Sequence, residues 1–305
     1  MSHNHCENRP VSVVSVPASV ILSRVDWTRL EAEHHARADA LTAGHRERAL
    51  RGETHPVWDF LFTYYSYKPS VMRKWHPGAG VALADAGGTD RADMRWYVTQ
   101  SDGTSRLGVS SFRELRGTGV QHVASLLRAT TTRAGRFDCF GMHEWAMVYR
   151  QDEHRHPVPL RLGQAGTDAV VEAADLKCTH YDAYRFFTPA AAPRNATTPT
   201  RQLQLIMEQP GCLHAGMDLY KWALKLGPVV SGDILLDAFE LACDIRLLDM
   251  QASPYDITAW GYDAVPVETA AGKAEYVRQQ REFAVRGEAI RGALIAAVTT
   301  FEEMT

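Results

Sequence analysis

The last third of the chain restricts the fold most, because it carries three long segments in which apolar residues recur at helical spacing. These segments cover about residues 200–227, 232–250 and 266–303. Gly227-Pro228 separates the first segment from the second, and Ser253-Pro254 follows the second. Glycine and proline at such positions end helices. The pattern therefore predicts a mainly α fold.

The rest of the chain adds shorter helices and one departure from helical patterning. Residues 26–51 have the pattern of a polar helix, and residues 56–75 that of a more apolar helix interrupted by a proline. Further helical patterns lie at residues 119–133, 141–151 and 167–187, before a proline-rich loop at 188–199. A strand around Leu176 to Phe187 is the alternative for the third of these segments. Glycines and a short apolar run predict a short β-hairpin excursion near residues 79–118. We expect one mainly helical domain over residues 23–305, preceded by an extended segment at residues 1–22.

Composition restricts the partners and the compartment. The 33 Lys and Arg residues are balanced by 36 Asp and Glu residues, so the formal net charge is −3. The chain lacks the basic excess that drives binding to phosphate backbones, and net charge does not support DNA as a partner. Pro17 interrupts the only apolar run near the N-terminus, and no segment has the roughly 18 apolar residues of a membrane span. Five scattered cysteines fit reduced thiols better than a disulfide framework. We expect a cytoplasmic protein without membrane contact.

The segment EQPGCLHAGMDLYKWALKL at residues 208–226 combines helical spacing with several reactive side chains. It contains Glu208, His214 and Asp218. His214 and Asp218 are four residues apart, so they lie on one helix face, where the carboxylate orients the imidazole or shares a metal with it. We predict that Glu208, His214 and Asp218 are catalytic residues in a pocket at the start of a buried helix.

Two Cys-x-His pairs are candidates for metal binding. Cys178 and His180 form one pair, and Cys212 and His214 form the other. Two thiolates and two imidazoles satisfy a tetrahedral zinc ion. The usual zinc spacing, with a few residues between paired cysteines, is missing from this sequence. Separate buried thiols next to hydrogen-bonded histidines are therefore the alternative to a metal site.

A third histidine also has an acidic neighbour. His143 is followed by Glu144 in the segment GMHEWAMVYRQ, which otherwise has the composition of a core helix. A single pair of this kind is usually a surface hydrogen bond, but several pairs in apolar segments favour a pocket. We predict that His143 and Glu144 contact a substrate there.

The segment HPVWDFLFTYYSYKPSVMRKWHPG at residues 55–78 collects aromatic side chains around one carboxylate, Asp59. Tyr64, Tyr65 and Trp75 are the candidates for stacking on a ligand. Such a cluster binds a flat, electron-poor or cationic ring through stacking and cation–π attraction. The alternative is a core helix whose tyrosines reach solvent.

Four motifs together resemble a broad actinobacterial family usually carried under the name 3-methyladenine DNA glycosylase. They are the aromatic segment at 55–78, MHEWAMVYR, EQPGCLHAGMDLYKWALKL and LLDMQASPYDI. The resemblance covers about residues 50–285 and implies an N-glycosidic hydrolase that acts on an alkylated purine. A flipped N-alkylated purine is cationic, which suits an aromatic cluster with a carboxylate.

In this hydrolase, Tyr64, Tyr65 and Trp75 would stack on the base. Asp59 or Glu208 would act on water, and His214 with Asp218 would position the leaving group. No cofactor is required. One alternative is a metal- or haem-dependent oxygenase-like enzyme that acts on a small aromatic molecule, with iron or haem bound by His214, His180 or His143. Another is a non-catalytic helical protein that binds a metabolite.

Overall fold

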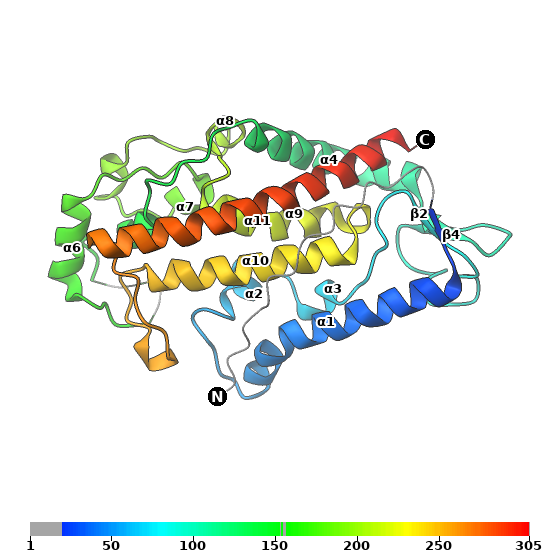
Figure 1. The fold of residues 1–305 in the computed structure, drawn as a ribbon, viewed down its shortest axis with the longest axis horizontal. Helices are drawn as coiled ribbons and strands as arrows, with labels where there is room; N and C mark the ends of the chain where they lie inside the picture. Colours follow the sequence, from blue (N-terminus) through cyan, green and yellow to red (C-terminus); the bar gives the residue numbers. More distant parts are fainter. Residues whose placement is uncertain (1–19, 153, 155–156, 305) are drawn as a thin grey trace.

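The computed structural model describes residues 20–152, 154 and 157–304, and helices dominate this part of the chain (Figure 1). The prediction of a mainly α fold is confirmed. Most of the expected extended segment, residues 1–19, lies outside the described residues. Its end, Val20–Leu22, forms strand β1.

Four long helices build the core of the molecule. Helices α9 (Leu213–Leu226), α10 (Gly232–Gln251) and α11 (Ala270–Glu303) pack against one another, and α4 (Val109–Thr131) packs against α9 and α11 (Figure 1). Helix α9 is buried over most of its surface and ends at Gly227, whose φ of +55° suits glycine. Among the described helices, none is both long and apolar enough to cross a bilayer.

The polar helix predicted at residues 26–51 is confirmed as helix α1 (Arg24–Leu50). It packs against α10, where Arg37 forms ion pairs with Asp237 at 2.6 Å and Glu240 at 2.9 Å. These pairs connect Asp237 and Glu240 of α10 to α1. Both carboxylates are therefore half-buried in the interface between the two helices.

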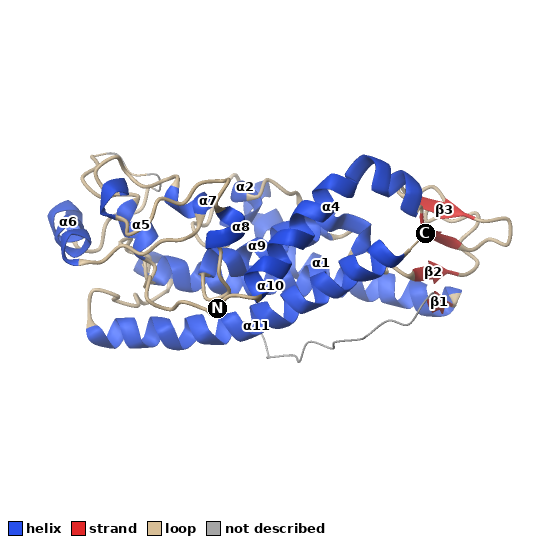
Figure 2. Ribbon diagram, turned by 90° about the horizontal axis from the view of Figure 1, so that it is seen from above, coloured by secondary structure: helices blue, strands red, loops and turns tan. Residues whose placement is uncertain are grey.

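Short helices occupy the end of the molecule opposite the sheet (Figure 2). They are α5 (Met142–Ala146), α6 (Gly163–Ala173), α7 (Tyr181–Tyr184) and α8 (Gln204–Met207). Two more, α2 (Phe60–Tyr64) and α3 (Pro69–Met72), replace the helix expected at 56–75. Short 3₁₀ turns lie at Ala192–Arg194, Gly227–Val229 and Thr258–Trp260. The helix expected over 200–227 is divided at Glu208–Cys212, because Pro210 and Gly211 interrupt it.

A small sheet closes the other end of the molecule. Its strand order is β1-β2-β4-β3, where β2 is Val81–Leu83, β3 is Tyr97–Thr99 and β4 is Ser105–Leu107. Strands β3 and β4 form the expected hairpin, β2 pairs antiparallel with β4, and β1 pairs parallel with β2.

The hairpin region ends earlier than the sequence suggested. Helix α4 begins at Val109, whereas the expected hairpin region extended to residue 118. The helix continues through Gly117 and Gly119. Phe112 and Val120 are buried on its inner face, and this packing outweighs the low helix propensity of glycine.

Candidate metal centre

A cluster of ionisable side chains lies buried where α5, α9 and α10 meet the segments that lead into α7 and out of α8. Its members are each less than 9% exposed: His143, Glu144, His180, Glu208, His214, Asp218, Arg246 and Asp249. Burying charge is costly unless the charge is paired or coordinates a metal. The partners of each group therefore indicate what the cluster can do.

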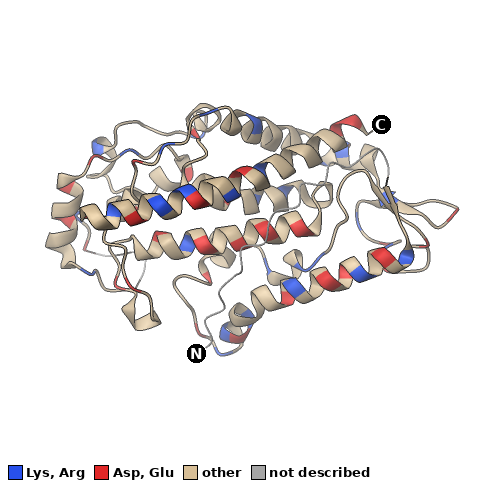
Figure 3. Cartoon of the chain, viewed as in Figure 1, with Lys and Arg blue, Asp and Glu red and all other residues tan. Residues whose placement is uncertain are grey.

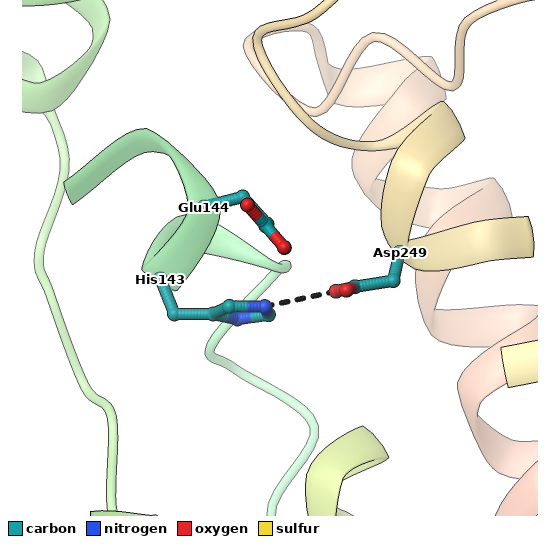
Figure 4. A group of neighbouring side chains, drawn as sticks. All are labelled: His143, Glu144 and Asp249. Atoms are coloured by element: carbon teal, nitrogen blue, oxygen red, sulfur yellow. Dashed lines mark ion pairs between the residues drawn. The ribbon is translucent and has the colours of Figure 1, made fainter. Parts of the chain in front are cut away.

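The first set of candidate ligands is His143 and Glu144 on α5 with Asp249 on α10 (Figure 4). One ligand atom from each of these residues lies within 4.8 Å of the others. His143 Nε2 is 2.9 Å from Asp249 Oδ1, yet neither atom has a partner with hydrogen-bond geometry. Both point into the space between the helices, as ligands of a common ion would (Figure 4).

Arg246 holds the two carboxylates of this set in place. Its Nη1 donates to Glu144 at 2.9 Å and to Asp249 Oδ2 at 2.8 Å, and its side chain is fully buried. The guanidinium also lies over the ring of Phe60, 3.7 Å from the centroid. Because Arg246 uses Oδ2, the other oxygen of Asp249 remains free for His143 or for an ion.

The second set consists of His180, Glu208 and Asp218, whose ligand atoms also lie within 4.8 Å of one another. His180 Nε2 is 3.4 Å from Asp218 Oδ2 and 3.5 Å from Glu208 Oε2. Asp218 also accepts hydrogen bonds from the Tyr65 hydroxyl, at 2.8 Å, and from the Lys221 ammonium group. The second set therefore contains a carboxylate whose orientation is fixed from two sides.

His214 lies between the two sets. Its ring centroid is 4.4 Å from that of His143 and 5.3 Å from that of His180. Burial and the nearby His143 lower the pKa of His214 well below its usual value, so its imidazole is neutral at pH 7. A neutral imidazole is the form that binds a metal ion.

Neighbouring charges shift the pKa values of the other ionisable groups in the cluster. Burial alone would lower the pKa values of His143 and His180, but the adjacent Asp249 and Asp218 raise them. Burial would raise the pKa of Asp218, but Lys221 and His180 hold it far below its usual range. Burial raises the pKa of Glu208, because desolvation disfavours its charged form. Without a metal, the cluster contains the ion pairs of His143 with Asp249 and of His180 with Asp218.

A pocket of about 20 Å³ reaches the cluster from one side. Its lining includes His143, His214, three thiols and the hydroxyl of Tyr276, which is buried and has no hydrogen-bond partner. The thiols belong to Cys139, Cys178 and Cys212. This volume holds about one water molecule, whereas pockets for drug-sized ligands have about 300–1,000 Å³.

The structure brings most of the sequence candidates together. His143, Glu144, His180, Glu208, His214 and Asp218 form the cluster, and Tyr65 binds Asp218. The predicted contact of His214 with Asp218 does not form, since no hydrogen bond joins them among the described residues and Asp218 pairs with His180. Cys178 and Cys212 line the pocket, but the described residues contain no compact Cys2His2 group.

Three other candidates lie apart from the ligand sets. Asp59 forms ion pairs with Arg48 and His45. Trp75 packs with Trp27 near the sheet. Tyr64 lies against the ring of Tyr65, at a centroid distance of 4.8 Å, and burial together with the charge of Asp218 raises the pKa of Tyr64.

Sequence reasoning did not identify Asp249, Arg246 or Tyr276. One signal was present: Asp249 and Arg246 interrupt the apolar run at the end of α10, and both are almost completely buried. Comparison of the chain with known proteins finds no matching family model, no matching curated protein and no matching solved structure.

Proposed function

We propose that this protein is a non-haem metal-dependent enzyme that uses a redox-active divalent metal, such as iron, to oxidise a small molecule with dioxygen. One observation carries the proposal. His143 Nε2 and Asp249 Oδ1 face each other in a buried site without hydrogen-bond geometry, with Glu144 in reach of the same point. Burying a carboxylate and an imidazole in one site is costly unless they are paired or coordinate a metal, and an ion bound between them would coordinate both.

The donor atoms match this class of metal. Imidazole nitrogen and carboxylate oxygen together suit iron, manganese or zinc, and a His/carboxylate set with open positions is typical of non-haem iron oxygenases. The neutral His214 beside His143 is a further nitrogen donor. The metal would supply dioxygen activation, while Arg246 orients Glu144 and Asp249 as metal ligands are oriented by their outer partners.

The pocket reaches the candidate metal ligands and admits a molecule of about the size of water or dioxygen. Its buried wall is formed by His143 and His214 with the apolar side chains of Met142, Leu213 and Phe187. Its other end carries the half-exposed Arg136, Asp138 and Lys177. A haem, a purine base and an organic substrate of the proposed oxidation would each need a larger cavity than the pocket provides.

The alkylated-purine hydrolase implied by the family resemblance stays a prediction. Its candidate for water activation, Asp59, is held by Arg48 through two hydrogen bonds, one from Nε at 2.9 Å and one from Nη2 at 2.5 Å. Its stacking candidate Trp75 packs with Trp27 in a separate apolar cluster. These contacts favour structural roles for both residues.

The test is metal content and dioxygen uptake of the full chain. We expect chelator-treated protein to bind Fe(II) under anaerobic conditions and to consume dioxygen when it is then admitted. The variants His143→Gln and Asp249→Asn should weaken metal binding by roughly 10–100-fold or more, because each loses a ligand. His122→Gln, which changes an exposed histidine on α4, is the matched control.

A folded His143→Gln protein that binds Fe(II) as tightly as the wild type would contradict the proposal. So would a metal-free wild type that releases bases from alkylated DNA, which would favour the hydrolase. A protein with neither activity nor metal would be the metabolite-binding alternative.

A further inference from the structure

The second set of ligands lies outside the site that carries the proposed function, and three separate segments of the chain build it. His180 lies just before α7, Glu208 just after α8, and Asp218 on α9. All three side chains are at least 96% buried. Packing alone does not require three ionisable groups from distant segments to converge in this way.

His180 provides an independent indication of a ligand. The residue is 1% exposed, and neither of its ring nitrogens has a hydrogen-bond partner. An imidazole that is fully buried between two carboxylates, without hydrogen-bond geometry to either, is unusual, because buried polar groups are nearly always hydrogen-bonded. The ring is therefore placed to meet something other than a protein hydrogen-bond partner.

The spacing within the set matches coordination of one ion. Two ligand atoms that are each about 2.1 Å from the same ion lie roughly 3.0–3.5 Å from each other in tetrahedral or octahedral geometry. His180 Nε2 lies 3.4 Å from Asp218 Oδ2 and 3.5 Å from Glu208 Oε2. These separations are long for hydrogen bonds of imidazole and fit the edges of a coordination polyhedron.

Outer partners already orient the two carboxylates. The Tyr65 hydroxyl donates to Asp218 Oδ1 at 2.8 Å, and the Gln204 amide donates to Glu208 Oε2 at 2.9 Å. Lys221 donates to Asp218 Oδ2, the same oxygen that faces His180, and also lies 3.3 Å from Asp182. Hydrogen bonds of this kind fix metal-ligating carboxylates in place.

We infer that His180, Glu208 and Asp218 bind a second metal ion, so that the cluster is a two-metal centre with His214 between the two ligand sets. The inference rests on the proposed function, because it assigns a second ion next to the one held by His143 and Asp249. His214 contacts the rings of both His143 and His180, so the two sets are contiguous. In enzymes with two metals in one site, the ions are about 3.5–4 Å apart.

The experiment counts ions with Mn(II) as the probe. Chelator-treated full-length protein is titrated with Mn(II) under anaerobic conditions, and bound metal is measured after gel filtration. We expect two ions per chain in the wild type and in His122→Gln, and one in His180→Gln and in Glu208→Gln. Glu208→Gln keeps the size of the side chain, so it remains informative if His180→Gln does not fold, and circular dichroism checks the fold of each variant.

Electron paramagnetic resonance provides the second measurement. Two adjacent Mn(II) ions interact magnetically, whereas a single bound Mn(II) gives a simple six-line spectrum. The wild type should give the coupled spectrum, and Glu208→Gln the six-line spectrum. One ion per wild-type chain, with unchanged binding in Glu208→Gln, would overturn the two-metal inference and leave the proposed function standing. No bound ion in the wild type would overturn both.

Discussion

At the scale of single residues, the carboxylate of Asp59 shows how neighbours decide the role of a group. It accepts hydrogen bonds from Arg48 Nε at 2.9 Å, His45 Nδ1 at 2.9 Å and the backbone N–H of His55 at 2.8 Å. Burial alone would raise the pKa of Asp59, but the hydrogen bonds from Arg48 and His45 outweigh it and lower the pKa. These contacts connect the end of α1 to the start of α2.

We predict that Asp59→Asn destabilises the protein at pH 7 by roughly 1.5–3 kcal/mol, the usual contribution of hydrogen bonds to a charged group. Because the folded-state pKa is lower than the unfolded one, the stabilisation is complete above the unfolded value near 3.8. It is lost as the pH falls through the folded value. Urea denaturation of wild type and variant should therefore show a difference that shrinks below about pH 4.

The control for this prediction is Asp39→Asn, which removes an exposed ion pair with Arg73. It should leave the urea midpoint nearly unchanged, because exposed pairs contribute little. Equal midpoints for wild type and Asp59→Asn at pH 7 would show that Asp59 is not a structural anchor, and would make its catalytic role the better interpretation.

At the scale of elements, the close approach of α9 to α10 sets the geometry of the cluster. Helix α9 carries His214 and Asp218, and α10 carries Asp249. Gly216 allows the contact, because a Cβ atom built there would lie 2.7 Å from Ile245 Cδ1. A larger residue at this position would push apart the helices that carry the two ligand sets.

We predict that Gly216→Ala destabilises the wild type by about 1 kcal/mol, because overpacking costs about 1–3 kcal/mol and exceeds the gain in helix propensity. In an Ile245→Val background, the clashing methyl group is gone, so the same change should be neutral or stabilising by up to about 1 kcal/mol. A double-mutant cycle by urea denaturation measures this coupling. Effects that add within about 0.5 kcal/mol would show that the two residues do not interact.

The sequence predicted the long elements well because their apolar spacing is local information. Helices α10 and α11 and the polar α1 were expected close to their observed positions, whereas the helix expected at 200–227 is divided and α9 begins only at Leu213. The short elements were not, because packing decides them. Residues 141–151 have helical spacing, but α5 ends at Ala146 and Arg150 has a φ of +53°. The interruption at Pro210-Gly211 was visible in the sequence, and it turns Glu208 toward His180.

At the scale of the whole molecule, the distribution of charge follows the helices and does not form a basic face along them. Lys and Arg alternate with Asp and Glu along α1 and α11 (Figure 3). Pairs such as Arg278 with Glu275 and Glu282 balance charge locally. Together with a net charge of −3, this arrangement provides little electrostatic attraction for duplex DNA.

The candidate site was predicted in part, and the missing part is non-local. The occurrence of histidines beside acidic residues in apolar segments pointed to six members of the cluster: His143, Glu144, His180, Glu208, His214 and Asp218. Their pairing was not predictable from spacing. Asp218 was expected to bind His214 on the same helix, but it pairs with His180 from a distant segment. Asp249 was not predicted, because little in its local sequence distinguishes it from the half-buried acids Asp237 and Glu240 on the same helix.

Because the candidate ligands come from α5, α9, α10 and the segments beside α7 and α8, a bound metal would connect parts of the chain that are far apart in sequence. Anything that binds only the folded state stabilises it, by about 2.7 kcal/mol at a hundredfold excess over Kd. For a chain of this size we predict that Mn(II) at a hundredfold excess over Kd raises the thermal midpoint of chelator-treated protein by roughly 4 °C.

Differential scanning calorimetry with and without Mn(II) measures that shift. Mg(II) at the same concentration is the control for general ionic effects, because nitrogen donors bind Mg(II) poorly. Asp249→Asn should reduce the Mn(II)-dependent shift, because it weakens the first set of ligands. Asp59→Asn should lower the thermal midpoint by the same amount with and without metal. If the midpoint of the wild type does not respond to Mn(II), Fe(II) or Zn(II), the two buried sets are ion pairs that stabilise the fold through protonated His143 and His180, and the cluster has no metal function.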